Sequence, residues 1–335
     1  MGARCQVSGV RCLVPGVGCQ VSGVRGQGAG RRPGASPFAL RGAFSFIEIM
    51  VVVALLSVIV LGLMAMFNQT QRAFRLGMSQ TDVLESGRMA TEMISRELGQ
   101  ITPCKLDRTN FAPNFAVQVM NVTWQALPGA GDRRTNILQD VFFLSRQNQT
   151  WTGIGYFVRT NLPGNSSVPG GVGPIGTLYR FETNMTAFQF DRNPAGLVAG
   201  FNAVVNQLAS NNVSKVLDGV VHFRIRPYDP AGWVIPFNPS WSTTVPTCMT
   251  NGNMVVTNFV AGEVRLYDFF SNMVPASVEF EIGALEPQAY DHYKVLPNEA
   301  VQWQYLTNQD ARAVSHMHLF RQRIPLRNVV PAAYQ

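Results

Sequence analysis

Charged residues make up only 14% of this 335-residue chain against 46% apolar residues, which excludes a disordered polyelectrolyte. Acidic residues are absent from residues 1–43, which hold six arginines. The net charge of +7 belongs almost entirely to that tail, because the remainder has 21 basic residues (27 minus 6) and 20 acidic ones. A basic surface on the folded part is therefore not expected, and neither is a nucleic-acid partner.

The stretch from Phe44 to Phe67 contains a single ionisable side chain, that of Glu48. At about 1.5 Å per residue, 44–67 is enough helix to span a hydrocarbon core of ~30 Å, so it predicts a single-pass membrane segment. A secretory signal is shorter and is followed by a small-residue cleavage site, which is not evident after Phe67. The arginines before the segment predict a cytoplasmic N-terminus and an exported C-terminal bulk.

Proline is absent from Phe44 to Ile101, which favours one long helix over 44–101. Beyond the membrane segment, apolar residues recur mostly every three to five positions, with polar residues between them. The apolar positions are Phe74, Met78, Val83, Leu84, Met93, Ile94, Leu98 and Ile101, and the polar ones are Gln80, Asp82, Glu85, Arg88, Glu92, Arg96 and Glu97. We therefore expect the second half of the helix to pack its apolar face on a domain and to end before Pro103.

From residue 102 onwards, short β-branched or alternating runs are separated by Gly, Pro and Asn, which is typical of strands. Six strands are predicted, beginning at Asp140 (DVFFLS), Gly153 (GIGYFV), Thr177 (TLYRF), Val220 (VVHFRIRPY), Ala276 (ASVEFEIGAL) and His316 (HMHLFRQRIPL). The Pro- and Gly-rich segments 161–176 and 227–247 are expected to be loop-like insertions. The predicted fold class is α+β, a long N-terminal helix packed on a β-rich globular domain over 102–335.

Cysteine is rare, and three of the five cysteines recur every seven residues in the tail, at Cys5, Cys12 and Cys19. We interpret this repeat as a translated short DNA repeat in an over-extended start rather than a metal site, because no histidine or carboxylate lies nearby. Beyond the membrane segment only Cys104 and Cys248 remain. A disulfide between them would persist on the exported side, but a sequence gives no distance, so the bonded and free forms both stay open.

Motifs of hydrolytic, metal and nucleotide sites are missing or lack their context. The chain has no G-x-S-x-G, H-E-x-x-H or EF-hand loop. Residues 171–176 match G-x-G-x-x-G, but a strand-like run follows where a phosphate-binding loop needs a helix. His316 and His318 share a face of a predicted strand without a nearby acid or cysteine, so we interpret them as half-exposed strand residues. No enzymatic activity, cofactor or metal ion is expected.

Behind the arginine-containing leader, Ala43 is followed by Phe44-Ser45-Phe46-Ile47-Glu48 and the apolar helix. This arrangement resembles the N-terminal signal of type IV pilins and pseudopilins. The resemblance implies that a prepilin peptidase cuts between Ala43 and Phe44 and methylates the new amine, although the family usually has glycine before the cut and here Gly42 lies one position early. It also implies an assembly role for Glu48, whose carboxylate would pair with the Phe44 amine of its own or a neighbouring subunit.

Two further stretches are similar to J-type minor pseudopilins of type II secretion, LDGVVHFRIRPYDPAGW over 217–233 and MVPASVEFEIG over 273–283. In the first we predict two turns around one strand. The turns are predicted at Asp218–Gly219 and Asp229–Gly232, and the residues expected to share one strand face are Val221, Phe223 and Ile225. The aromatic side chains of Trp233, Phe237 and Trp241 are interpreted as covering the edge of a core, with a binding surface as the alternative.

The resemblance implies a structural subunit anchored in the bacterial inner membrane, with its C-terminal domain in the periplasm and incorporated into a pseudopilus. The implied partners are the prepilin peptidase, other minor and major pseudopilins and the inner-membrane assembly platform, within a tip complex that primes assembly. A minor type IV pilin for adhesion or DNA uptake is an alternative that uses the same anchor. A signal-anchored periplasmic enzyme or binding module is a third hypothesis, which predicts no cleavage before Phe44.

Overall fold

The computed structural model divides the chain into two compact units, residues 1–63 and 64–335. The residues described are 45–106, 112–126, 133–159, 173–207, 212–235, 248–251, 253–260, 263–307 and 317–334. Every strand in the described residues and the later part of the first helix belong to the second unit.

Helix α1 runs Phe46–Leu98, in agreement with the helix predicted over 44–101. It ends in a tight turn, where the N–H of Gln100 donates to the Glu97 carbonyl and that of Ile101 to the Leu98 carbonyl. Further helices in the described residues were not predicted. They are α2 (Ala187–Arg192), α3 (Gly196–Gln207), α4 (Pro287–Lys294), α5 (Glu299–Thr307) and the 3-10 helix η3 (Pro331–Tyr334).

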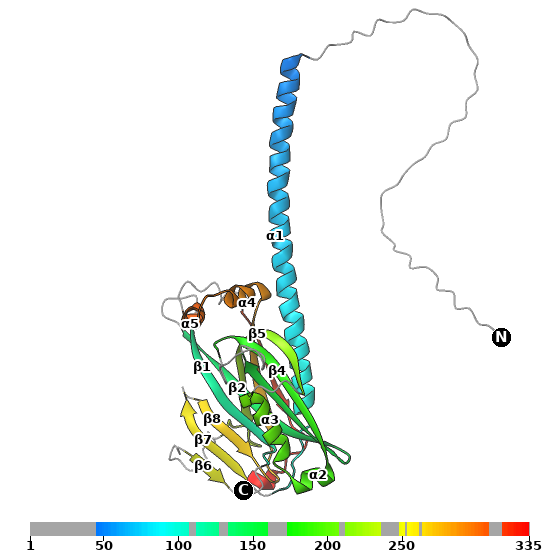
Figure 1. The fold of residues 1–335 in the computed structure, drawn as a ribbon, viewed down its shortest axis with the longest axis vertical. Coiled ribbons are helices and arrows are strands. Elements are labelled where there is room, and N and C mark those ends of the chain that lie inside the picture. Colours follow the sequence, from blue (N-terminus) through cyan, green and yellow to red (C-terminus); the bar gives the residue numbers. More distant parts are fainter. Residues whose placement is uncertain are drawn as a thin grey trace, which may run out of the picture. The chain divides into compact units, whose positions relative to one another are not determined.

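The described strands form one ten-stranded sheet (Figure 1). They are β1 (Phe115–Ala126), β2 (Arg133–Gln147), β3 (Thr150–Arg159), β4 (Gly176–Thr186), β5 (Val213–Tyr228), β6 (Cys248–Asn251), β7 (Met254–Val260), β8 (Glu263–Phe269), β9 (Ser277–Leu285) and β10 (Met317–Pro325). Their order is β10-β9-β5-β4-β3-β2-β1-β8-β7-β6, and each neighbour in this order is antiparallel. The fold class is therefore α+β, as predicted.

The six predicted strands are confirmed as β2, β3, β4, β5, β9 and β10, whereas β1, β6, β7 and β8 were missed. Strands β6 and β7 begin after the predicted loop over 227–247, in a stretch for which no strand was predicted. Pairing of β7 with β8 makes it a strand despite the neighbouring prolines. Helix α3 was missed because its glycines and valines are weak helix formers, and packing of Leu197, Phe201 and Val204 on the sheet stabilises it instead.

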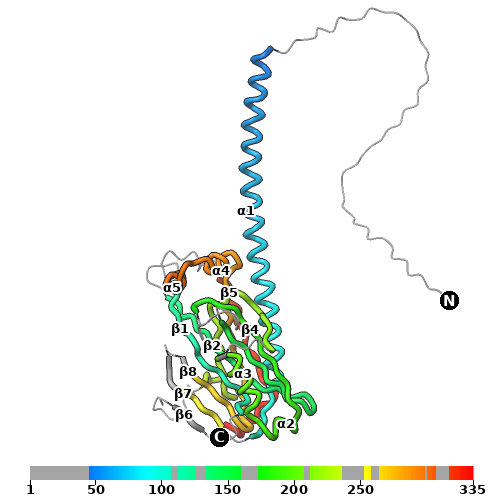
Figure 2. Tube along the Cα trace, in the orientation of Figure 1, coloured from blue at the N-terminus to red at the C-terminus, as the bar shows by residue number. Residues whose placement is uncertain are grey.

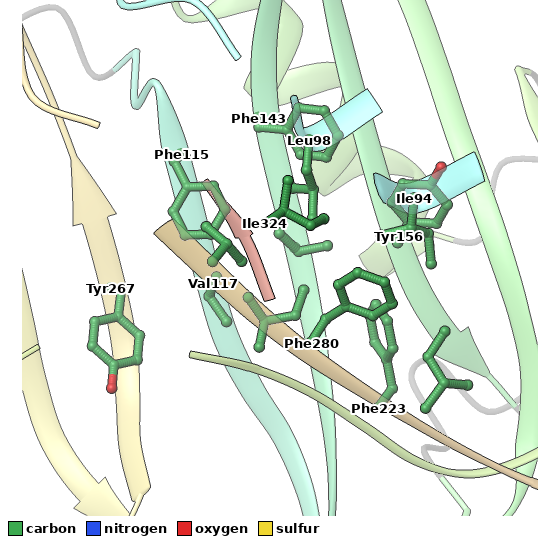
Figure 3. Packing of buried hydrophobic residues seen from close by; sticks show 14 of the residues in the cluster. Ile94, Leu98, Phe115, Val117, Phe143, Tyr156, Phe223, Tyr267, Phe280 and Ile324 are labelled. Carbon is green, nitrogen blue, oxygen red and sulfur yellow. The ribbon is translucent and has the colours of Figure 1, made fainter. Parts of the chain in front are cut away.

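Two hydrophobic clusters cover opposite faces of the sheet, because neighbouring residues along β2 and β3 alternate between them. One contains Phe143 and Tyr156 together with Ile94 and Leu98 of α1 (Figure 3). The other contains Phe142 and Phe157 together with side chains of α2 and α3. Each fully buried large apolar side chain stabilises the fold by roughly 1.5–3 kcal/mol, so the sheet is held between α1 on one side and α2 and α3 on the other.

Strands β2 and β5 are also neighbours, joined by a single parallel bridge. Side-chain hydrogen bonds there take the place of backbone hydrogen bonds that a full strand pairing would supply. The Ile137 N–H donates to Nδ1 of His222 (3.1 Å), and the Ile225 N–H donates to Oε1 of Gln139. Because Nδ1 accepts, Nε2 carries the imidazole proton and donates to Glu281 (3.2 Å). A neutral histidine thus holds three strands together.

The first predicted turn is wrong, because Asp218 and Gly219 form a bulge inside β5 in which both residues lie opposite Thr177 of β4. The Thr177 hydroxyl donates to the Asp218 carboxylate (2.7 Å). Gly219 has a φ of +68°, and an added Cβ would lie 3.3 Å from the carbonyl oxygen of Leu285. A glycine is needed here for a bulge rather than for a reversal of the chain.

A second bulge, at Val221, lies in the pairing of β5 with β9. Val221 therefore packs with the small cluster around α4, while Phe223 and Ile225 lie in the main cluster, so the prediction of a shared face is wrong for Val221. The second predicted turn is confirmed. Gly232 has a φ of +87°, and its N–H donates to the Asp229 carbonyl (3.0 Å).

Candidate functional site

The N-terminus of α1 carries a capping box. The Glu48 N–H donates to Oγ of Ser45 (3.3 Å), and the Ser45 N–H donates to Oε2 of Glu48 (3.1 Å). This reciprocal pair satisfies two backbone donors that have no partner within the helix. Glu48 therefore has a local structural role that our sequence reasoning missed, although Ser-x-x-Glu before an apolar run is the known signal for it.

The apolar run after the capping box is exposed along its whole length. Its large apolar side chains from Phe46 to Phe67 are 44–75% exposed, and α1 contains an 18-residue window with a mean hydropathy of 3.0. Among the described residues, α1 is the helix long and apolar enough to cross a membrane. Exposed apolar surface costs roughly 25 cal/mol per Å² in water, so this run needs lipid or protein around it.

Between Ser79 and Leu98, one face of α1 packs on the sheet through small and apolar side chains. The buried apolar and small residues recur every three or four positions, at Ser79, Val83, Gly87, Ala90, Ile94 and Leu98. An added Cβ on Gly87 would lie 2.2 Å from the ring of Phe320 on β10. Near the end of the helix, the Ser95 hydroxyl donates to Oε1 of Gln322 (2.8 Å). The helix and β10 thus approach each other closely.

Glu97 anchors the end of α1 to the sheet, although we had placed it on the polar face. Its side chain is nearly buried, and it accepts hydrogen bonds from the Tyr156 hydroxyl and from Arg180, whose Nη2 lies 2.8 Å from Oε1. Burial, reinforced by the Glu97 carboxylate, raises the pKa of Tyr156 far above its ordinary value. Burial alone would lower the pKa of Arg180, but its bonds to Glu97 and Glu182 raise it, so Arg180 stays charged.

The opposite side of α1 leaves large apolar side chains exposed. Phe67, Phe74, Met78 and Met89 are 60%, 66%, 61% and 61% exposed. At 3.6 residues per turn, these four positions fall within an arc of about 60° that faces away from the buried positions. We name these four residues the apolar stripe. Phe74 and Met78, which we had expected to pack on the domain, therefore do not.

The predicted processing residues Ala43 and Phe44 lie outside the described residues. Of the alternatives for Cys104, the structure contains the free thiol, which lies 3.7 Å from the Ala112 carbonyl oxygen. Burial raises the pKa of Cys104, so the thiol stays protonated. Cys248 begins β6, where its backbone pairs with that of Thr257.

Several rejected motifs fall partly within the described residues. His318 has an acidic neighbour that the sequence did not indicate, because its Nε2 lies 3.1 Å from Oε1 of Glu286. No group of three or more His, Cys, Asp or Glu that could hold a metal ion is found among the described residues. The Trp233 residue is half exposed, and its backbone N–H donates to the Asp229 carboxylate (2.7 Å). His316, Phe237, Trp241 and the first residues of the G-x-G-x-x-G match lie outside the described residues.

Comparisons with known proteins leave function to be argued from α1. Scans of protein families, of curated proteins and of solved structures returned no match for this chain. The geometry brings together a capped and uncovered apolar helix, a fixed attachment to the sheet and the apolar stripe.

Proposed function

We propose that this chain is a membrane-anchored structural subunit of a pilus-like filament, in the class of J-type minor pseudopilins, without catalytic activity. The apolar stripe carries the proposal. About 20 helical residues cross a hydrocarbon core, so lipid accounts for the exposed side chains of 46–67 but not for Phe74, Met78 and Met89. A helix from a neighbouring subunit would cover them, as in a bundle of parallel anchors.

In this proposal Ala43 and Phe44 flank the cut made by a prepilin peptidase, and Glu48 fixes the axial register of the assembled subunits. The carboxylate then exchanges its local bond to Ser45 for a charge pair with an N-terminal amine. Such a pair offsets the cost of an ion in a medium of low dielectric. The capping box keeps Glu48 satisfied in the meantime, which supports insertion of the free subunit.

The partners of the proposed subunit are the prepilin peptidase, minor and major pseudopilins and the inner-membrane assembly platform, with the globular domain in the periplasm. Adhesion or DNA uptake by a minor type IV pilin would use the same helix. The capping box also fits a rival function, that of a periplasmic module merely tethered by α1. A tether needs no cleavage and no charge at Glu48.

The first test is the N-terminal residue and intact mass of the chain recovered from membranes, with and without a prepilin peptidase. We expect a peptidase-dependent chain that begins at methylated Phe44. An uncleaved chain in the presence of an active peptidase would contradict the proposal and favour the tether.

The second test separates the charge of Glu48 from its capping role. Glutamine can also complete a capping box, so Glu48→Gln keeps the cap and removes the charge, whereas Glu48→Ala removes both. We expect both variants to insert in the membrane and both to lose incorporation into filaments or tip complexes, measured by cross-linking to partner pseudopilins. Incorporation of the Gln variant at the level of the unsubstituted chain would show that only the cap matters.

A further inference from the structure

A polar cleft of about 760 Å³ lies beside the C-terminal end of α1. That end of the helix lies against β3 and β4 (Figure 2), where Glu97 bonds Tyr156 and Arg180. Beyond it, the same face of β2, β3 and β4 continues into the cleft without a helix over it among the described residues. The volume lies in the range of sites that bind small molecules.

The register of three neighbouring strands defines the floor of the cleft. Side chains of residues that pair across β2 and β3, or across β3 and β4, share a face of the sheet. Successive rows on this face, from the end of α1 outwards, are Phe143–Ile154–Glu182, Ser145–Thr152–Asn184 and Gln147–Thr150. The face thus changes from mostly apolar to polar where α1 ends, and every residue of the last two rows lines the cleft.

Two further segments form the rim. One contributes Arg96 and Gln100, from the last turn of α1 and the tight turn that follows it. The other contributes Asn148 and Gln149, which connect β2 to β3. All four residues are exposed, so their amides and the Arg96 guanidinium are free to turn towards a ligand.

The polar side chains of the floor are not used by the fold. Ser145 is only 3% exposed, yet its hydroxyl makes no hydrogen bond with any described residue. The side chains of Thr152 and Asn184 likewise have no hydrogen-bond partner in the described part of the chain. A nearly buried polar group is costly without a partner, so this row requires water or a ligand.

The charges in the cleft balance. Arg180 lies between two carboxylates, with Nη2 2.8 Å from Oε1 of Glu97 and Nη1 2.6 Å from Oε2 of Glu182. Arg96 supplies a second positive charge, so the described lining residues carry two cations and two anions. Because both glutamates are already paired with Arg180, the cleft offers no free carboxylate to a cation. The complementary ligand is therefore neutral.

The lining also distinguishes between neutral ligands. Ile154 is the one apolar residue among the described residues of the cleft, so an apolar molecule or an apolar peptide side chain finds no pocket there. A peptide strand cannot be added at β3, because its backbone is paired with β2 on one edge and β4 on the other. Each hydroxyl of a sugar both donates and accepts, and side-chain amides and hydroxyls match it in both directions.

We propose that this cleft binds a neutral oligosaccharide. Ser145, Thr152 and Asn184 bond the hydroxyls of a sugar ring that lies on the floor, and Ile154 packs on an apolar C–H face of that ring. The amides of the rim bond the neighbouring rings. This binding does not depend on whether the chain assembles into a filament.

The test uses the full chain in lipid nanodiscs and saturation-transfer NMR of unlabelled trisaccharides, with empty nanodiscs as the blank. The neutral probes are cellotriose, maltotriose, mannotriose, galactotriose and triacetylchitotriose. We expect at least one of them to bind with a Kd below about 10 mM, and no binding of any of them at that concentration would overturn the proposal.

Three further probes test the choice of a neutral sugar. The deacetylated chitosan trimer is cationic, trigalacturonate is anionic, and the end-blocked peptide Ser-Asn-Gln-Ser is polar and neutral. We expect each to bind at least about tenfold more weakly than the best neutral sugar, a difference of about 1.4 kcal/mol. A smaller difference for any of the three would assign the cleft to a charged ligand or to a peptide and would contradict the proposal.

Variants locate the binding. Asn184→Trp fills the cleft from an exposed floor position and should abolish binding, while Asn202→Trp, at an exposed position of α3 outside the cleft lining, should not. Gln147→Ala removes one amide of the floor and should weaken binding several-fold, and Gln80→Ala, at an exposed position of α1, should leave it unchanged. Binding that survives Asn184→Trp, or that falls equally in the matched variants, would refute the assignment to this cleft. Thermal unfolding of each variant checks that the domain is intact.

Discussion

Two glycines on α1 show how one residue type meets different demands. Gly77 has no atom within 4 Å of the position that a Cβ would occupy, whereas at Gly87 that position is 2.2 Å from the ring of Phe320. Glycine in a helix interior costs about 1 kcal/mol relative to alanine. At Gly77 nothing in the described structure offsets that cost, while at Gly87 the close approach of β10 does.

We predict opposite outcomes for alanine at these two positions. Gly77→Ala should raise the free energy of unfolding by up to about 1 kcal/mol. Gly87→Ala has the same gain in helix propensity but overpacks the contact with Phe320, so it should be less stable than Gly77→Ala by about 1–3 kcal/mol. Urea unfolding of both variants measures the difference, and equal stabilities would show that Phe320 moves aside freely.

At the scale of elements, α1 is attached to the sheet by packing along its length and by one polar cluster at its end. Glu97, Tyr156 and Arg180 come from α1, β3 and β4. Removing one member leaves the others desolvated without a partner, which costs more than the pair itself contributes.

Glu97→Ala should therefore lower the free energy of unfolding by about 3–5 kcal/mol. The matched control is Glu92→Ala, one to two turns earlier on an exposed position of the same helix, where we expect a change within about 0.5 kcal/mol. Urea unfolding followed by tryptophan fluorescence gives both values. A loss below 1 kcal/mol in Glu97→Ala would mean that water replaces the carboxylate.

The buried His222, which bonds β5 to β2 and β9, makes the free energy of unfolding depend on pH. Burial lowers the pKa of His222 below its ordinary 6.5, and the hydrogen bond to Glu281 offsets only part of this. Between the lowered pKa and 6.5 the unfolded chain binds more protons than the folded one, so stability falls as the pH drops below about 6.5. The bond from His222 lowers the pKa of Glu281 from its ordinary 4.5, so the contribution of this carboxylate is lost only at pH below 4.5.

Between pH 7.5 and 5, the free energy of unfolding should accordingly fall, and His222→Asn should flatten this dependence. The asparagine Oδ1 takes the place of Nδ1 and can still accept from the Ile137 N–H, while the titrating group is gone. Urea titrations at several pH values in this range measure both slopes. An unchanged slope in the variant would assign the effect to another group.

For the whole molecule, the sequence predicted the parts with strong periodicity and missed those that only tertiary contacts define. The absence of proline and the apolar run located α1, and six runs of β-branched residues located six strands. No pattern indicated that Glu97 is buried, because its partners Tyr156 and Arg180 lie 59 and 83 positions away. The burial of the small residues Ser79, Gly87 and Ala90 of α1 was not predicted either, because large apolar side chains dominate a hydropathy pattern.

The candidate site was predictable to the same extent. Glu48 stood out as a lone charge in an apolar run, and the Ser-x-x-Glu spacing that explains its local bonds was present in the sequence. The exposure of Phe74 and Met78 was not predictable, because their hydropathy is the same as that of the residues that pack on the sheet.

The contact between Gly87 and Phe320 joins residues that lie 233 positions apart in the sequence (320 minus 87). During synthesis α1 emerges before β1 to β9 and these before β10, so the face of α1 has to wait for all the intervening strands before its partner strand exists. If the chain is exported as it is made, its core stays open until β10 has crossed. A chain that stalls before β10 then presents an incomplete sheet to proteases.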